Sequence, residues 1–328
     1  MKIIVFDTAV GTSNRGDDII VSSAEIYLRP LLEQSFVMRF GTHVKNLGWA
    51  HCLTNSVKIK YAKEADYKFI LGTNLLTSNA IRSMKQWPVL SLPDYLLYKN
   101  CILMGVGIKF KDTKLSLHTR LLYEKLLRKD IIHSVRDEQS KKLLSSISGL
   151  QVLNTGCPTL WSLTPELCEK IPTFKGPNVI ATVSGYKSQQ DAIKDQQMIA
   201  ILEKNYEKIY LWVQTSEDEQ YYKTLQHQKD VQRIYSFKQF KEVCQNGKVD
   251  YIGTRLHGGI YAMQCGVRTL IVEIDQRAEG FRLTNNINTI KRDKIQALED
   301  VLHSQIKTEI RLKSAEIKEW LAQFHYNV

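Results

Sequence analysis

Residues 249–266 read VDYIGTRLHGGIYAMQCG, and this stretch indicates the class of fold. The run VDYI suits a buried β-strand, whereas IYAMQ after the glycines suits a helix. Arg255 and His257 would then lie in the turn where the strand ends and the helix begins. In open α/β folds, ligands bind at that edge of the sheet. The stretch therefore predicts a strand, a turn and a helix, with a candidate site in the turn.

The same alternation of strand-like and helix-like segments runs along the chain. Short apolar or β-rich runs that end near Gly, Asp or Asn are the strand candidates of the first half, at 2–7, 36–41, 67–72, 101–108, 131–137 and 150–156. Those of the second half are 178–185, 208–214, 232–237, 250–254 and 269–274. Helical patterns occupy 17–34, 115–129, 189–205, 217–228 and 237–247. This alternation predicts the α/β class, with parallel sheets covered by helices.

The length of the chain predicts two lobes, because 328 residues exceed what one hydrophobic core usually supports. Segment 163–178 holds three of the seven prolines, lacks a clear strand pattern and is the linker candidate. We therefore expect an N-terminal lobe at 1–173 and a C-terminal lobe at 174–328. Near the end, SAEIKEWLAQF places apolar residues on one helical face, which must dock on the protein and could pack back across the lobes.

Composition and cysteine usage exclude several classes of protein. The chain is 43% hydrophobic and 24% charged, as in soluble globular proteins. No apolar run approaches the roughly 18 residues that cross a bilayer. The start, MKIIVFDTAV, is too soon interrupted by Asp7 to be a signal peptide, so we expect a cytoplasmic protein. The six cysteines are scattered without a C-x-x-C pair or histidines at metal-ligand spacing, which favours reduced thiols over disulfides or a metal site.

The charge balance favours an anionic partner. The chain has 45 Lys and Arg against 34 Asp and Glu, a net charge of +11. A phosphate ester or an anionic membrane surface would suit this charge, and so would a generally basic, solvated surface with no specific partner. No basic run with interleaved aromatic residues occurs, so we expect no nucleic-acid partner.

Two glycine-containing stretches resemble phosphate-binding loops but lack the required spacing. GTSNRGDD at 11–18 is neither a P-loop nor a dinucleotide fingerprint. It is either a turn with Asp17 as helix cap or a polar loop in which Asn14 and Asp17 contact a sugar hydroxyl. MGVGIKF at 104–110 has Phe110 where the dinucleotide pattern needs a third glycine, so its glycines are expected to permit close packing or a tight turn.

HSVRDEQS at 133–140 places Arg136 at the end of an apolar run. One interpretation is a local ion pair at a helix start, with Asp137 and Glu138 as partners. The other is that Arg136 holds a carboxylate or phosphate in two-point contact, as the planar guanidinium can.

GTRLHGG at 253–259 combines several features that suit an anion. A helix that starts near His257 aims backbone N–H groups and a partial positive charge at the turn. Arg255 adds a full charge, and Gly258 and Gly259 would let a ligand approach the backbone. The same helix dipole disfavours the imidazolium form of His257, which would then give up a proton readily. The alternative is a histidine that only caps the helix or fills a gap.

Taken in order, these motifs resemble the polysaccharide pyruvyl transferase family. The elements that carry the resemblance are NRGDD at 14–18, SVRDEQS at 134–140, GCP at 156–158, TRLHGG at 254–259 and IDQRAEGF at 274–281. They extend from about Asp7 to about Phe281. The sequence departs from the family pattern in two places: no glycine run follows the third strand, and Arg277 stands where a lysine is usual.

The resemblance implies two Rossmann-like, GT-B-like lobes with the active site in the cleft between them. It implies transfer of the enolpyruvyl group of phosphoenolpyruvate to a sugar, which leaves a pyruvate ketal and releases phosphate without a cofactor or metal. By position, Arg136 and Arg255 would bind phosphoenolpyruvate, and His257 would be the general acid. Asn14 and Asp17, Gly258 and Gly259, and Arg277 would complete the substrate site. The acceptor would belong to a cell-surface polysaccharide, such as a capsule or exopolysaccharide, and would often be lipid-linked.

The chemistry of phosphoenolpyruvate suits such residues on independent grounds. Its dense negative charge needs cationic, fork-shaped donors, and protonation of its methylene carbon needs a placed acid. Two other classes stay open. A GT-B-type nucleotide-sugar glycosyltransferase would need an acidic ribose ligand, for which Glu273, Asp275 and Glu279 are candidates. A non-catalytic protein would bind the anion without turnover.

Overall fold

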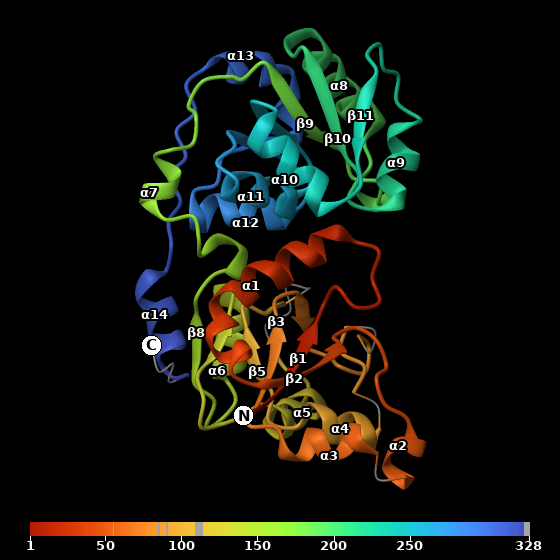
Figure 1. Ribbon diagram of the computed structural model, residues 1–328, viewed down its shortest axis with the longest axis vertical. Coiled ribbons are helices and arrows are strands. Elements are labelled where there is room, and N and C mark those ends of the chain that lie inside the picture. The colour runs from red at the N-terminus through yellow and green to blue at the C-terminus, as the bar shows by residue number, and fades with distance from the viewer. Residues whose placement is uncertain (55, 84–85, 90, 109–113, 325–328) are drawn as a thin grey trace. The chain divides into compact units, whose positions relative to one another are not determined.

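The chain folds into two compact units. The computed structural model describes residues 1–54, 56–83, 86–89, 91–108 and 114–324 (Figure 1). The N-terminal unit comprises Met1–Thr12, Ile20–Trp161 and the chain from Lys313 onward, and the C-terminal unit comprises Ser13–Ile19 and Ser162–Leu312. The division after Trp161 comes ahead of the boundary predicted near residue 173, and the chain returns to the N-terminal unit after Leu312.

The N-terminal unit is built on a four-stranded parallel sheet in the order β2-β1-β3-β5. Its strands are β1 (Lys2–Asp7), β2 (Phe36–Gly41), β3 (Tyr67–Leu71) and β5 (Ile102–Met104), and the short parallel pairs are β4 (Asn74–Leu76) with β6 (Gly107–Ile108) and β7 (His133–Val135) with β8 (Val152–Asn154). The four residues Ile3–Phe6 are fully buried. A continuous apolar run suits β1 because helices cover both faces of such a sheet.

The helices of this unit are α1 (Arg15–Glu33), α2 (Trp49–Leu53), α3 (Val57–Glu64), α4 (Leu92–Tyr98), α5 (Leu117–Leu126), α6 (Glu138–Ser145) and α14 (Ser314–Ala322), with a 3₁₀ turn, η1 (Pro158–Leu160). The first residues of α1 belong to the C-terminal unit. The predicted apolar face of the last helix packs in the N-terminal core. Trp320 is fully buried, and its ring centroid lies 6.0 Å from that of Trp161 and 4.8 Å from that of Phe324.

The C-terminal unit is a six-stranded, fully parallel sheet in the order β11-β10-β9-β12-β13-β14. The strands are β9 (Asn178–Thr182), β10 (Lys208–Trp212), β11 (Val231–Ile234), β12 (Val249–Gly253), β13 (Thr269–Glu273) and β14 (Thr289–Lys291). In chain order this is 3-2-1-4-5-6, the arrangement of dinucleotide-binding Rossmann domains. The chain runs from β9 to β10 on one side and from β12 to β13 on the other, so the switch point lies between β9 and β12.

The helices of the C-terminal unit are α7 (Pro165–Cys168), α8 (Ala192–Asn205), α9 (Ser216–Tyr222), α10 (Phe237–Asn246), α11 (Leu256–Gln264), α12 (Gln276–Asn285) and α13 (Leu298–His303), with 3₁₀ turns η2 (Lys187–Gln189) and η3 (Arg292–Ala297). Capping residues start several of them. Asp191 caps α8, Ser236 caps α10 and Asp275 caps α12, each by accepting hydrogen bonds from backbone N–H groups of the first turn.

A buried ion pair anchors the segment that the sequence identifies as a linker. Arg268 donates to Asp250 at 2.8 Å, and Tyr206 donates to the same carboxylate at 2.7 Å. Arg268 also donates to the carbonyl of Thr173 at 3.2 Å, and Gly176 donates its N–H to Asp250 at 3.1 Å. The segment is therefore fixed on the C-terminal unit through hydrogen bonds to a nearly inaccessible pair.

The structure confirms the predicted α/β class with parallel sheets. Each predicted strand region contains an observed strand. The sequence patterns did not predict the helices α2, α3, α4, α7, α12 and α13 or the strands β4 and β14, and the predicted helix at 217–228 ends at Tyr222. All six cysteines are free thiols. Within the described ranges, no helix combines the length and apolar character that crossing a bilayer requires.

Candidate functional site

A buried carboxylate, Asp218, joins three loops at the carboxyl ends of the C-terminal strands. It lies in the first turn of α9, after β10, and is 1% exposed. One of its oxygens accepts the N–H of Gly185, after β9, at 2.8 Å, and the other accepts the N–H of Thr215 at 3.2 Å. Both oxygens also accept hydrogen bonds from Arg255, after β12. Asp218 therefore holds the loops on both sides of the switch point.

Arg255 is a buried residue whose guanidinium contacts Asp218 and the ring of Tyr186. Its Nε donates to Asp218 at 2.9 Å, its Nη2 donates to the other oxygen of that carboxylate, and Nη2 lies 3.3 Å from the hydroxyl of Thr215. The guanidinium carbon is 4.5 Å from the ring centroid of Tyr186. The side chain is only 5% exposed, and within the described residues the hydrogen bonds that it donates come from Nε and Nη2. The fork of Arg255 is thus largely committed to Asp218.

His257 lies in the first turn of α11, two residues after Arg255, which occupies the capping position. The helix has nine residues, and its N-terminal N–H groups face the switch point. Two residues of the sheet fix the backbone of this turn. The hydroxyl of Tyr251 donates to the carbonyl of Arg255 at 2.7 Å, and the hydroxyl oxygen of Thr182 accepts the N–H of Arg255 at 3.2 Å. The half-buried His257 is therefore presented on a rigid turn beside a helix N-terminus.

Gly258 and Gly259 lie where α11 packs closely against the sheet. A Cβ on Gly258 would lie 2.7 Å from the hydroxyl of Tyr251, and a Cβ on Gly259 would lie 2.7 Å from the side chain of Ile271. Both glycines are buried against the sheet. The glycines therefore permit close packing of α11 on the sheet, and their role in the approach of a ligand to the backbone stays a prediction.

The loop before α1 is ordered by Asn14. Its side-chain oxygen accepts the N–H of Gly16 at 3.0 Å and the amide of Gln214 at 2.9 Å, and the N–H of Arg15 donates to the carbonyl of Gln214 at 3.0 Å. All these residues belong to the C-terminal unit. Asn14 takes the capping position, so the alternative that assigned the cap to Asp17 is wrong. Asp17 lies inside the first turn of α1, where its negative charge suits the helix dipole.

Arg277 lies at the exposed start of α12. It donates to Asp275 at 2.6 Å and 2.9 Å, and its side chain is 44% exposed. Burial opposes ionisation of Asp275, but Arg277 and the capped N–H groups outweigh it and hold the pKa of this carboxyl below its usual value. Asp275 also accepts the amide of Gln189 at 3.0 Å, which connects the loop after β9 to α12.

Arg136 belongs to the N-terminal unit and follows β7. Its guanidinium donates to the side-chain oxygen of Asn74 on β4, and it lies so close to Gly107 that a Cβ there would be 2.3 Å from Nε. Asp137 caps α6 by accepting the N–H of Ser140 at 2.7 Å. Arg136 is thus directed toward β4 and β6, and Asp137 acts as a helix cap.

The glycines of MGVGIKF permit close packing, as predicted. Gly105 has φ of +64°, and a Cβ on it would lie 2.1 Å from Pro158 of the GCP motif. Gly107 leaves room for Arg136. The last two residues of this stretch, Lys109 and Phe110, lie outside the described residues. This stretch therefore packs against two motifs of the family resemblance, GCP through Pro158 and SVRDEQS through Arg136.

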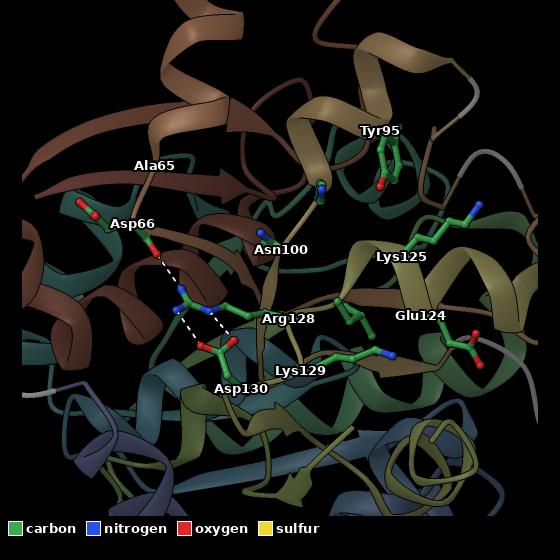
Figure 2. Close-up of a pocket in the computed structure, with 11 residues that line it drawn as sticks. Ala65, Asp66, Tyr95, Asn100, Glu124, Lys125, Arg128, Lys129 and Asp130 are labelled. Carbon is green, nitrogen blue, oxygen red and sulfur yellow. Dashed lines mark hydrogen bonds and ion pairs between the residues drawn. The ribbon is translucent and has the colours of Figure 1, made fainter. Parts of the chain in front are cut away.

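A surface pocket of about 630 Å³ lies elsewhere in the N-terminal unit (Figure 2). Its walls come from residues that precede β3, β5 and β7, so it is at the amino ends of these parallel strands. Arg128 lies in it and is held by Asp130 at 2.9 Å and 3.0 Å and by the carbonyl of Asp66 at 2.7 Å (Figure 2). Because its arginine is already paired and its lysines are exposed, we assign no ligand to this pocket.

Sequence reasoning missed Asp218 and Tyr186. Asp218 had a usable signal, because Thr215 and Asp218 have the T-x-x-D spacing of a capping box directly after an apolar strand. That pattern places the carboxylate at a strand's carboxyl end. Nothing in the local sequence connects Tyr186 with Arg255, which is distant along the chain.

Comparison with known proteins supports the family and the fold. A family model described as polysaccharide pyruvyl transferase matches residues 14–276, most of the chain. The UDP-GlcNAc 2-epimerase of Methanocaldococcus jannaschii, solved with UDP-GlcNAc and UDP, superposes with a TM-score of 0.52 at 12% identity over 98% of this chain and 99% of that chain. A putative UDP-N-acetylglucosamine 2-epimerase from Listeria monocytogenes gives 0.51 at 11% identity over 99% and 97%.

A sequence comparison with curated proteins finds no match. The likeness to the epimerases shows a shared GT-B-like fold and, at this identity, nothing further. The family match covers the N-terminal loop, the Arg136 segment and the Arg255–His257 turn. The chain belongs to the polysaccharide pyruvyl transferase family.

Proposed function

We propose that this protein transfers the enolpyruvyl group of phosphoenolpyruvate to a sugar of a cell-surface polysaccharide or its precursor, forming a pyruvate ketal and releasing phosphate. The observation that carries the proposal is the placement of the family's TRLHGG element. It lies at the switch point of a parallel sheet, where α/β folds bind ligands, with His257 at a helix N-terminus. Family membership supports a transferase that acts on polysaccharides.

In the proposed reaction, His257 supplies a proton to the methylene carbon of phosphoenolpyruvate. Positive charge then develops at C2, which a sugar hydroxyl attacks, and that hydroxyl gives its proton to the now neutral His257. Attack by a second hydroxyl expels phosphate and closes the ketal, and the proton of the second hydroxyl leaves with the phosphate. A placed acid of this kind typically contributes about 10² to 10⁴ in rate. The proposed reaction takes phosphoenolpyruvate as its donor substrate and needs no cofactor or metal.

The contacts of Arg255 refine its proposed role. Together with Asp218 it forms a pair without net charge, so it attracts an anion less strongly than an unpaired arginine would. Its contribution would be a hydrogen bond of fixed direction at the turn, since both Asp218 and Tyr186 hold the guanidinium in place. The helix N-terminus would supply further positive potential, and the family resemblance assigns Arg136 to the same donor and Arg277 to the substrate site.

The first test follows thermal unfolding with phosphoenolpyruvate, with inorganic phosphate and with a panel of nucleotide sugars. A ligand at about 100 times its Kd adds about 2.7 kcal/mol to the stability of the state that binds it. A shift with phosphoenolpyruvate that is lost in Arg255→Ala supports the proposal. A shift with a nucleotide sugar alone would instead favour a GT-B-type glycosyltransferase, and binding of phosphoenolpyruvate without turnover on any acceptor would favour an anion-binding protein.

We also propose that the basic protein associates with anionic membranes, where lipid-linked acceptors would be found. The net charge of +11 supports this, because basic surfaces are attracted to anionic lipids. Cosedimentation with vesicles that contain anionic lipid should decrease as salt increases. Cosedimentation that does not depend on salt would contradict an electrostatic association.

A further inference from the structure

The short helix α2 exposes apolar side chains at the margin of the N-terminal unit. Its sequence is WAHCL, and none of its residues is buried. Trp49 is 57% exposed and Leu53 is 84% exposed. Residues four apart share one face of a helix, so these two side chains lie on the same side of α2. The helix contacts α3 and α4, and its outer side faces away from the sheet of this unit (Figure 1).

The chain turns directly from α2 into α3 and adds a third exposed apolar side chain. The N–H of Ser56 donates to the carbonyl of His51 at 3.0 Å, so the start of α3 is held against α2. The next residue, Val57, is the first of α3 and is 73% exposed. We call Trp49, Leu53 and Val57 the apolar tip.

The apolar tip lies in a part of the sequence that lacks acidic residues. Residues 34–63 contain no Asp or Glu, and their basic residues are Arg39, Lys45, Lys58, Lys60 and Lys63. All four lysines are exposed. The ion pairs that the described residues of this unit form include none of these lysines. Positive charge therefore accompanies the apolar tip, both before α2 and along α3.

An anionic membrane surface suits this combination better than a second copy of the chain. Tryptophan favours the interface between water and lipid, Leu and Val gain by entering the acyl boundary, and lysines are attracted to anionic headgroups. A second copy would instead bring the same positive charges to a two-fold interface, where like charges repel. A stable protein interface also uses about 20–30 residues on each side, whereas the apolar tip has three side chains.

We propose that the apolar tip inserts into the headgroup region of an anionic membrane, with Lys45, Lys58, Lys60 and Lys63 against the lipid phosphates. This inference rests on the membrane association proposed above and identifies the surface that makes the contact. It adds an apolar contribution to the electrostatic one. Binding should still decrease as salt increases, because the lysines supply the long-range attraction.

Trp49 gives a direct readout of insertion. The other four tryptophans, Trp87, Trp161, Trp212 and Trp320, are each at most 6% exposed. The full-length protein is mixed with vesicles of phosphatidylcholine that carry brominated acyl chains, with or without phosphatidylglycerol. We expect the anionic vesicles to quench the emission of Trp49 and shift it to shorter wavelength, and the neutral vesicles to do so less. In Trp49→Phe the quenching should be lost, whereas cosedimentation with the vesicles should be retained.

A double variant tests the two aliphatic side chains of the apolar tip. Leu53→Ser combined with Val57→Ser should lower the affinity for anionic vesicles on the order of tenfold, because both side chains lose their apolar contact with lipid. Both residues are exposed, so the fold should be little affected. The matched control is Leu283→Ser on α12 of the C-terminal unit, where the leucine is 62% exposed. It should bind the vesicles like the wild-type protein.

The possible failures can be told apart. If the wild-type protein and the double variant bind anionic vesicles equally well, the apolar tip is not the contact, and an association by charge alone remains. If the wild-type protein does not bind these vesicles, the membrane association and this inference both fail, whereas enolpyruvyl transfer is untouched. If light scattering shows a dimer and the emission of Trp49 shifts with protein concentration in the absence of lipid, a second copy covers the tip and the proposal is overturned.

Discussion

Replacing Asp218 by asparagine tests whether the carboxylate organises the switch point. In the wild-type protein, one oxygen of Asp218 accepts the N–H of Gly185, and the other accepts the N–H of Thr215 and the Nε–H of Arg255. The asparagine amide keeps an acceptor oxygen for Gly185, but its NH₂ group would face the two other donors. The charge of Arg255, which is 5% exposed, loses its counterion. Breaking a buried pair by removing one partner costs about 3–5 kcal/mol. We expect Asp218→Asn to lower the free energy of unfolding by that amount.

The assay is urea denaturation of Asp218→Asn, Arg255→Gln and the double variant, followed by circular dichroism. Each single variant leaves one buried charge, whereas the double variant leaves none, so the double should cost less than the sum of the singles by about 1–3 kcal/mol. The exposed pair of Arg277 and Asp275 is the control, and Arg277→Gln should cost about 1 kcal/mol or less. Additive single effects, or a cost below that of the control, would refute the role given to Asp218.

The remaining predictions concern pH, packing and binding. Burial lowers the pKa of His133 to about 4, so this histidine stays neutral in the folded protein, whereas in the unfolded chain it binds a proton below about pH 6.5. The free energy of unfolding should therefore fall by about 2 kcal/mol between pH 7.5 and pH 5. Urea titrations at the two pH values should show this loss in the wild-type protein and not in His133→Gln. Gly258→Ala should lower the free energy of unfolding by about 1–3 kcal/mol in the same assay, because the added Cβ would meet the side chain of Tyr251. Gly280→Ala in α12 is the control: open space surrounds this glycine, so the variant should raise the free energy of unfolding by up to about 1 kcal/mol. Under the proposed function, Arg255→Ala and Arg136→Ala should each abolish phosphoenolpyruvate binding measured by calorimetry, whereas His257→Ala should retain binding and lose turnover; equal loss of binding in all three would contradict this division of roles.

The local pattern of the chain was sufficient for the class of fold and for the position of the turn. Apolar runs such as that of β1 predict buried parallel strands because both faces of the sheet are covered, and the glycines after Arg255 indicate a tight transition into a helix. Short helices such as α2 and α3 were not predicted, because brief and irregular apolar spacing does not distinguish them from loops.

The sequence by itself therefore determined the α/β class, the family motifs and the presence of Arg255 and His257 at the carboxyl end of a strand, because periodicity and turn chemistry act between residues close together in the chain. Only the tertiary structure decided that Arg255 is paired with Asp218 and that Gly258 packs on the sheet. These contacts depend on which strands become neighbours and on how helices pack over them. Strand order and packing are set by the burial of the whole core, which no local pattern encodes.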